Sequence, residues 1–309
     1  MESKPYGVDV SKETLDIACE GRVVTIENEP KAIRRFVKSA GEGSLVAMES
    51  TNTYHEKMAN ACFAAGLRVY VVNPRVTRHY REVMSLHGHN DRMDARALAS
   101  YIQRHYDELR PYAPKPKDAR RLATLNRRRS KLVGIRVQLW QSMREVKELK
   151  SDIEAIIARI DELVAKVQLL IDKQLEGDED RARLETIKGI GPVVSAALVC
   201  DLKYGDFRKA DAFVAFYGLD PRPNDSGKSK GQRKISKRGQ RLGRTLLYNA
   251  AMTAARSKAW KPIYERLLAK GLAKIQALAA LARKLARTAW SVYTHKTTFD
   301  PARLCRALT

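Results

Sequence analysis

Four acidic residues are the first candidates for chemistry in this 309-residue chain: Asp9, Glu49, Asp91 and Asp94. Asp91 and Asp94 stand three positions apart in "NDRMDARALA", at the start of a run with helical apolar spacing. Residues at i and i+3 share one face of a helix, with Cβ atoms about 5–6 Å apart. Two ionised carboxylates there repel each other unless a cation lies between them. An acidic first turn is also favoured by the helix dipole, which suffices for an isolated pair.

The other two acids stand in or beside expected strands. Asp9 lies in "GVDVS", where a buried acid is costly without a partner, and Glu49 ends "SLVAMES". If these strands are neighbours, both acids project toward the same rim of the sheet, and the helix from residue 91 can bring its acids across. Hard divalent cations bind such carboxylate clusters. One or two Mg²⁺ ions there could hold a phosphodiester and stabilise the attacking and leaving oxygens.

The elements that would position these acids are short alternating strands and helices in residues 1–110. Apolar periodicity predicts strands in 5–11, 14–20, 22–28, 44–50 and 67–73, and helices in 30–40, 54–66 and about 92–105. This order favours a mixed sheet flanked by helices, an α/β fold.

Residues 111–180 are expected to be a linker followed by a coiled-coil hairpin. "RPYAPKPKD" is proline-rich, as linkers are. Apolar residues then recur every seven positions from Leu125 to Val146, and at alternating spacings of four and three from Ile153 to Ile171. The first helix is basic and the second acidic, so they could pair within one chain or between two.

Charge is concentrated in the last part of the chain. The sequence has 58 Lys and Arg against 35 Asp and Glu, a net charge of +23, which favours a polyanionic partner such as nucleic acid. Residues 226–299 hold eighteen Lys or Arg and a single acid, Glu265. The basic, amphipathic helix expected near the end is better explained by nucleic-acid contact than by a membrane surface.

The four cysteines are scattered without a Cys-x-x-Cys pair, which fits a reducing compartment rather than a zinc site or a disulfide framework. The N-terminus lacks the pattern of a signal peptide, and no apolar stretch is long enough to span a membrane. We therefore expect a cytoplasmic protein.

Residues 181–309 are expected to be a mainly helical domain that binds nucleic acid. "LETIKGIGPVVSAALV" has the pattern of a helix-hairpin-helix, in which Gly189 and Gly191 would leave backbone N–H groups for a phosphate; a tight turn between packed helices is the alternative. The glycine-containing stretch from Ser226 to Arg244 has eight basic residues and no acid, and it could follow a phosphate backbone. The basic candidates are Arg222, Lys228, Lys230, Arg233, Lys234, Lys237, Arg238, Arg241 and Arg244.

Three motifs together resemble a known family: "GVDVSKETLD", "AMESTNTYH" and "NDRMDARALA". They are similar to the RuvC-like Asp-Glu-Asp-Asp transposases of bacterial insertion sequences, relatives of the Piv-type DNA invertases and of bridge-RNA-guided recombinases. The resemblance covers nearly the whole chain. It implies an RNase H-like fold for residues 1–110 and assigns the metal-binding tetrad to Asp9, Glu49, Asp91 and Asp94.

Ser226 is a candidate nucleophile only through this resemblance, because a bare serine is a poor nucleophile and spacing alone indicates a turn. "GLDPRPNDSG" followed by "ISKRGQRLGRTLLYNAA" resembles the family's second signature, which implies that Ser226 attacks DNA. Ser236 is the rival and Ser229 a third choice. Gly239 and Arg244 match positions expected to contact phosphates.

The resemblance implies a DNA transposase or recombinase in the bacterial cytosol or nucleoid. It would act on double-stranded donor and target DNA through a phosphoserine link, with Mg²⁺ and a structured bridge RNA as cofactors, as a homodimer or homotetramer. Two alternatives stay open. One is a junction-resolvase-like nuclease that uses the tetrad with water, and the other is a non-catalytic nucleic-acid-binding scaffold.

Overall fold

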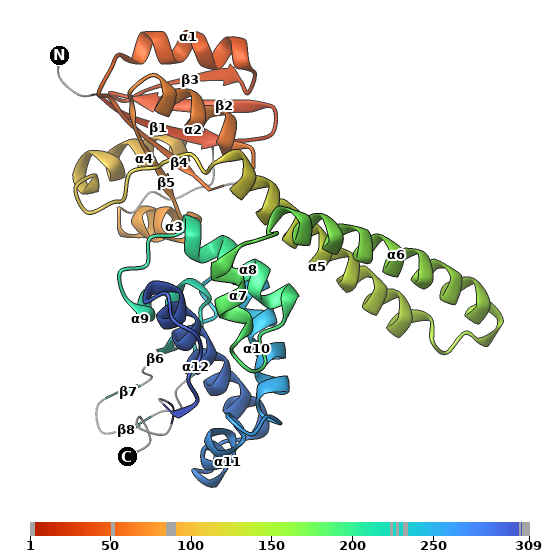
Figure 1. Ribbon diagram of the computed structural model, residues 1–309. Helices are drawn as coiled ribbons and strands as arrows, with labels where there is room; N and C mark the ends of the chain where they lie inside the picture. Colours follow the sequence, from red (N-terminus) through yellow and green to blue (C-terminus); the bar gives the residue numbers. More distant parts are fainter. Residues whose placement is uncertain are drawn as a thin grey trace. The chain divides into compact units, whose positions relative to one another are not determined.

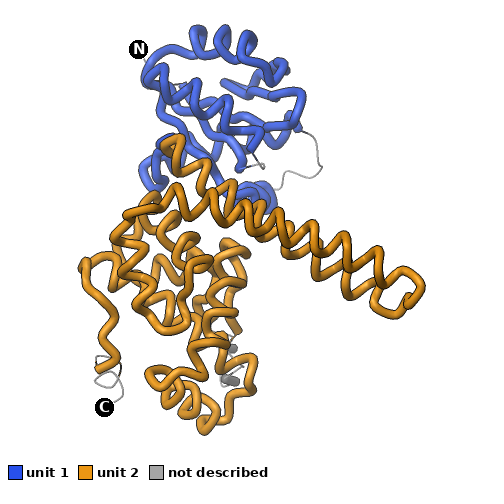
Figure 2. The backbone as a smooth tube through the Cα atoms, turned by 45° about the vertical axis from the view of Figure 1, so that its right-hand side comes forward, with its two compact units in different colours: residues 1–114 blue, residues 115–309 orange. Residues whose placement is uncertain are grey.

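The computed structural model describes residues 4–50, 53–84, 91–222, 225–226, 229–230, 234–302 and 304. It divides the chain into two compact units, residues 1–114 and residues 115–309 (Figure 2). Each unit has its own hydrophobic core, and each is described here by itself.

The first unit is a mixed five-stranded sheet with helices on both faces (Figure 1). Its sheet order is β3-β2-β1-β4-β5; β1 to β3 are antiparallel neighbours, whereas β4 runs parallel to both β1 and β5. The predicted α/β class is confirmed. The elements are β1 (Pro5–Val10), β2 (Thr14–Cys19), β3 (Arg22–Glu27), α1 (Pro30–Ala40), β4 (Leu45–Glu49), α2 (His55–Ala64), β5 (Arg68–Val72), α3 (Pro74–Val83) and α4 (Asp91–His105).

Alternation along β1 separates the two faces of the sheet. Val8 and Val10 point into a core that contains Ile33 of α1 and Met58 of α2. The intervening residues face the opposite side, where Leu45 and Ala47 of β4 pack with Leu98 and Ile102 of α4. Side chains alternate between the faces of a strand, so Asp9 belongs to the α4 face.

The second unit is mainly helical, as expected, and its described residues also form four short strands. Its core gathers apolar side chains from α5, α6, α8, α9, α10 and α12. The elements are α5 (Lys117–Met143), the 3₁₀ turn η1 (Lys147–Leu149), α6 (Lys150–Gln174), α7 (Glu179–Glu185), α8 (Pro192–Tyr204), α9 (Ala210–Phe216), β6 (Pro221–Arg222), β7 (Asp225–Ser226), β8 (Ser229–Lys230), β9 (Lys234–Ile235), α10 (Arg241–Ala254), α11 (Lys261–Ala269) and α12 (Lys274–Thr294).

Helices α5 and α6 form a long antiparallel hairpin within this unit (Figure 1). Leu122 near its start and Ile171 near its end are buried in the common core, so the root of the hairpin is part of the unit's packing. Farther along, Arg136 donates to Asp161 at 2.6 Å, joining the basic first helix to the acidic second. Across the described stretches of the chain, no helix combines the length and apolarity needed to cross a membrane.

Candidate catalytic and nucleic-acid-binding sites

Three acidic residues lie side by side on one face of the sheet. In the β1–β4 pairing Val8 stands opposite Met48, which makes Asp9 and Glu49 the next residues along two parallel neighbours. On the other side of β1, Asp9 is paired directly with Asp16 of β2. The register therefore places Asp9, Glu49 and Asp16 on adjacent strands. Asp9 and Glu49 are close, as predicted, because β4 lies beside β1.

Helix α4 crosses this face in close contact with β1. A Cβ atom at Gly7 would lie 2.0 Å from the carbonyl oxygen of Ala95, so only glycine allows this approach. Asp9 lies two residues after Gly7 and shares its face, and Asp91 begins the helix. The backbone contact at Gly7 therefore holds the acidic end of α4 near Asp9.

The closeness of these acids changes the pKa of Asp9. The pKa of Asp9 is raised to about 6, mainly by burial and then by the negative charges of Asp91, Glu49 and Asp16. A hydrogen bond to the backbone at Val10 acts in the opposite direction. Asp9 is thus a half-buried carboxyl group whose pKa is raised first by burial and second by the acids around it.

The remaining predicted ligand, Asp94, is engaged differently. Its carboxylate forms an ion pair with Arg81 of α3, and both side chains are mostly buried, with exposures of 24% and 11%. Glu49 also has a partner, since the Thr77 hydroxyl donates to its Oε1. Of the four predicted acids, the structure brings Asp9, Glu49 and Asp91 into electrostatic contact and pairs Asp94 with a cation.

The chemistry of this acid set fits a divalent cation. Carboxylate oxygens are the donors that hard cations prefer, and an ion near Asp9 would relieve the repulsion that raises its pKa. Within the described parts of the chain, no three Asp, Glu, His or Cys side chains are already gathered at ligand spacing. Asp9, Glu49 and Asp91 would supply the ligands, with Asp94 adjoining through its helix.

Asp16 was not among the residues selected from the sequence. It is 8% exposed, accepts a hydrogen bond from Thr25 on β3, and adds to the negative field at Asp9. The signal was present in "TLDIAC", where an acid stands directly between the apolar Leu15 and Ile17. Its significance depends on β1–β2 register, which spacing alone does not determine.

In the second unit, the predicted hairpin glycines lie between α7 and α8. Gly189 has φ +104°, and a Cβ atom there would lie 2.7 Å from that of Ala254 on α10. Its lack of a side chain thus serves packing. Gly191 precedes Pro192 at the start of α8, with open space where a Cβ would be. A phosphate contact by either N–H stays a prediction.

The basic loop is the segment from β6 to the start of α10, residues 221–240, and its two ends lie against each other. Strand β6 pairs with β9, matching Pro221 with Ile235 and Arg222 with Lys234. A Cβ atom at Gly239 would lie 2.3 Å from the carbonyl oxygen of Phe216, so the ends meet backbone to backbone. Strands β7 and β8 pair between these ends. The predicted residues Lys228 and Arg233 lie outside the described residues, as do the side chains of Ser226 and Lys230.

The cations at the loop base fall into two groups. Lys234, Lys237 and Arg238 are exposed, as is Arg241 at the start of α10. Arg244 instead donates through Nη1 to the carbonyl oxygen of Tyr217 at 2.8 Å and of Gly239 at 3.4 Å. The first group is available to a polyanion, whereas Arg244 ties together the two ends of the loop.

Ser236, the rival nucleophile, also bridges the loop ends. Its N–H donates to the carbonyl oxygen of Asp220 at 2.9 Å, and its hydroxyl donates to the carboxylate of the same residue. Both contacts join the strand entering the loop to the strand leaving it. Ser236 therefore has a structural role at this position.

A buried carboxyl group supports the same region. Asp201 of α8 accepts hydrogen bonds from the Tyr217 hydroxyl at 2.9 Å and from Gln240 Nε2 at 3.3 Å. The pKa of Asp201 is about 6, because the increase caused by removal from solvent outweighs the lowering by these donors and by Lys115. Gln240 also caps α10 by accepting from the Gly243 N–H, so Asp201 helps to fix where the loop ends.

Two family models match the chain over regions that contain these sites. A model described as "Transposase IS116/IS110/IS902 family" matches residues 181–265, and a model of DEDD transposases of the IS110 type matches residues 6–149. The chain therefore carries the two transposase domains of the IS110/IS116/IS902 family. The four acids lie within the DEDD match, and the hairpin glycines, the basic loop and Ser226 lie within the other. The predicted resemblance is thereby confirmed.

Individual relatives agree with this family. "Pilin gene-inverting protein" of Moraxella bovis is 28% identical over 262 residues, covering 82% of this chain and 81% of that protein. The "Transposase for insertion sequence element IS1328" of Yersinia enterocolitica is 25% identical over 95% of this chain and 98% of its own length. A Pseudomonas aeruginosa "Probable family 20 transposase" is 33% identical over 50% of this chain; the match spans 46% of that protein.

Proposed function

We propose that this chain is a DNA transposase or recombinase of a bacterial insertion sequence, which cuts and rejoins double-stranded DNA. The observation that carries the proposal is the electrostatic contact of Asp9 with Glu49 and Asp91 in the region that matches the DEDD-type model. The basic second domain provides the complementary feature, a cationic surface for donor and target DNA.

In the first domain, we propose an RNase H-like fold of the RuvC type. The order β3-β2-β1-β4-β5, with an antiparallel half and a parallel half, supports this assignment. Asp9, Glu49 and Asp91 would hold one or two Mg²⁺ ions, and Asp94 is the fourth candidate ligand. Bound there, the metal would supply positive charge to a phosphodiester in reaction.

In the second domain, we assign the nucleophile to Ser226. Its hydroxyl oxygen attacks the scissile phosphorus and loses its proton, and the bond from phosphorus to the 3′ oxygen breaks. The products are a phosphoserine link and a 3′ hydroxyl that has taken up a proton and later attacks a new partner. Exposed cations such as Lys234 and Arg238 would neutralise phosphate charge during this step.

The choice of Ser226 over Ser236 is supported by the structural engagement of Ser236 with Asp220. Strand exchange between two DNA sites requires more than one active site, which supports a homodimer or homotetramer. A structured guide RNA belongs to the same proposal, because the positive charge of the second domain suits RNA as well as DNA.

Trapping of the covalent intermediate tests this function. The full chain is incubated with Mg²⁺ and a nicked suicide DNA substrate, and the protein–DNA adduct is mapped by mass spectrometry. We expect an adduct at Ser226 that disappears in Ser226→Ala and in Asp9→Asn, and persists in the matched Ser236→Ala. Cleavage that continues in Ser226→Ala without any adduct would instead identify a nuclease that uses water. Unchanged activity in Asp9→Asn would leave only a scaffold role.

A further inference from the structure

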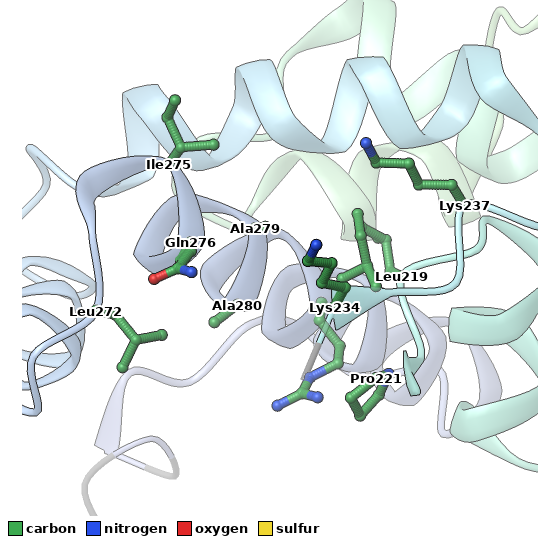
Figure 3. A pocket seen from close by; sticks show the side chains of 11 residues that line it. Leu219, Pro221, Lys234, Lys237, Leu272, Ile275, Gln276, Ala279 and Ala280 are labelled. Atoms are coloured by element: carbon green, nitrogen blue, oxygen red, sulfur yellow. The ribbon is translucent and has the colours of Figure 1, made fainter. Parts of the chain in front are cut away.

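A groove of about 570 Å³ lies in the second unit between the base of the basic loop and α12 (Figure 3). Its apolar lining includes Leu219 before β6, Ile235 of β9, Leu272 just ahead of α12, and Ile275 in the first turn of α12. The small side chains of α12 at residues 279 and 280 line it as well. Ile275 is 71% exposed, which is unusual for a residue of its type.

Cations surround this apolar surface. Lys234, Lys237 and Arg283 line the groove, and among the described residues that line it none is acidic. Behind Arg283, burial lowers the pKa of Lys284, as does the positive charge of Arg283 and of Arg287, Lys270 and Arg266. The wall formed by α12 is therefore strongly positive, which fits a polyanionic ligand.

A groove that is both apolar and cationic suits some polyanionic ligands better than others. A phosphate backbone alone requires only charge and hydrogen-bond donors. Bases inside a duplex have their faces covered by stacking, whereas an unstacked base offers a flat apolar face that side chains can cover. The groove's volume falls in the range of pockets that enclose a small organic ligand.

We propose that this groove holds an unpaired deoxynucleotide of the DNA substrate, with its base against Leu272 and Ile275 and its flanking phosphates at Lys234 and Arg283. The groove adjoins the loop that bears Ser226, because β9 pairs with β6 and Ser226 follows β6 after three residues. The choice of DNA as the source of the nucleotide rests on the proposed function. The nucleotide would then be held next to the cleavage point.

The test measures binding with the full chain and a metal chelator, so that cleavage does not interfere. Fluorescence anisotropy is recorded with a labelled single-stranded DNA oligonucleotide, with the same oligonucleotide made abasic at successive positions, and with its duplex. We expect Ile275→Asp to weaken single-strand binding about tenfold and duplex binding less than about twofold. An acid at this first-turn position of α12 is compatible with the helix.

Two control variants separate the groove from general charge effects. Leu169→Asp adds the same negative charge at another exposed apolar residue, on α6, which is 68% exposed and does not line the groove. Arg256→Gln removes a positive charge at an exposed residue outside the groove, as a match for Arg283→Gln. We expect each control to affect single-strand binding at least about threefold less than its partner in the groove.

The proposal is overturned if Ile275→Asp weakens duplex and single strand equally, or if an abasic oligonucleotide binds as tightly as the intact one at every position. A change of oligomeric state in Ile275→Asp without DNA would assign the groove to a second copy of the chain. Tighter, Ile275-dependent binding of the matching RNA would assign it to RNA. The adduct assay tests the proposed function separately. An adduct at Ser226 without Ile275-dependent binding would contradict only the groove proposal. Ile275-dependent binding without an adduct would contradict only the serine chemistry.

Discussion

Gly7 of β1 lies directly against the backbone of Ala95 in α4. A Cβ atom at Gly7 would stand 2.0 Å from the Ala95 carbonyl oxygen and 2.2 Å from the amide nitrogen of Ala99. The helix that begins with Asp91 is thus in contact with the strand that carries Asp9 at a separation that no side chain permits. The geometry of the acid cluster depends on this contact.

Gly7→Ala should displace α4 from the sheet. Overpacking of this kind costs about 1–3 kcal/mol in the free energy of unfolding, which urea denaturation followed by circular dichroism would measure. The displacement would also move Asp91 relative to Asp9, so Mg²⁺-dependent DNA cleavage should fall by more than the loss of folded protein explains.

Gly134→Ala provides the matched control. Gly134 lies within α5, and a Cβ atom there meets nothing within 4 Å. Alanine is the better helix former, so this change should stabilise the chain by about 0.5–1 kcal/mol and leave cleavage intact. A Gly7→Ala variant as stable as the natural chain would show that α4 can adjust without cost.

Asp9→Asn should change how stability depends on pH. The raised pKa of Asp9, about 6, means that the folded chain binds this proton more tightly than the unfolded chain does. The resulting stabilisation is fully present below the unfolded pKa of about 3.9 and is lost as pH rises through about 6. Solvent at this half-buried group limits the effect to about 1 kcal/mol.

Thermal melts in a chelator between pH 4 and pH 8 would measure this effect. We expect Asp9→Asn to melt above the natural chain at pH 8 and to match it near pH 4. Mg²⁺ should raise the melting temperature of the natural chain at pH 8 more than that of the variant. Asp201 has a pKa shifted in the same direction, but the comparison between the two chains removes its contribution. A natural chain that is more stable at pH 8 than Asp9→Asn would contradict the electrostatic account.

Asp94→Asn and Asp91→Asn should differ in stability although both acids belong to the proposed metal site. Asp94 neutralises Arg81, whose side chain is 11% exposed, and its loss leaves a mostly buried cation without this partner. We expect Asp94→Asn to cost about 1–3 kcal/mol in a chelator. Asp91 is exposed and repels Asp9, so Asp91→Asn should be neutral or slightly stabilising. Equal losses in urea denaturation would rule out a special role for the Arg81 pair.

Arg244→Lys should loosen the basic loop without removing a phosphate contact. Lysine cannot reproduce the contacts from one guanidinium to the carbonyl oxygens of Tyr217 and Gly239. We expect slower adduct formation at Ser226, while the slope of log K against log salt for duplex DNA stays unchanged. The exposed Arg238 is the contrast, because Arg238→Gln should reduce that slope by about 1. Arg244→Gln tests a phosphate contact directly, because it removes the charge: a slope reduced by about 1 in that variant would return Arg244 to the phosphate contacts.

Local patterns predicted much of the first unit, because strands and helices there follow short apolar periodicities. The expected strand around Asp9 is β1, and the expected helix from about residue 92 is α4. Strands β1 and β4 are neighbours, as the acid cluster requires. Asp9, Glu49 and Asp91 could therefore be associated before any coordinates were known.

Features that depend on tertiary contacts could not be predicted in this way. The pairing of Asp94 with Arg81 arises where α3 meets α4, and the place of Asp16 beside Asp9 depends on strand register. Arg244 looks like any other cation in a basic stretch until the fold surrounds it with carbonyl groups. Sequence patterns indicate which residues can react, whereas partners distant in the chain determine which of them are already occupied.

The alternation of side chains along β1 also limits how this domain can diverge. Gly7 and Asp9 serve the α4 face, while Val8 fills the opposite core. Inserting or deleting a single residue ahead of Asp9 within the strand would point the Asp9 carboxylate into the apolar core. A valine would then face the acids instead. This segment can therefore accept substitutions but not insertions or deletions. Relatives that retain the chemistry should align with it without gaps.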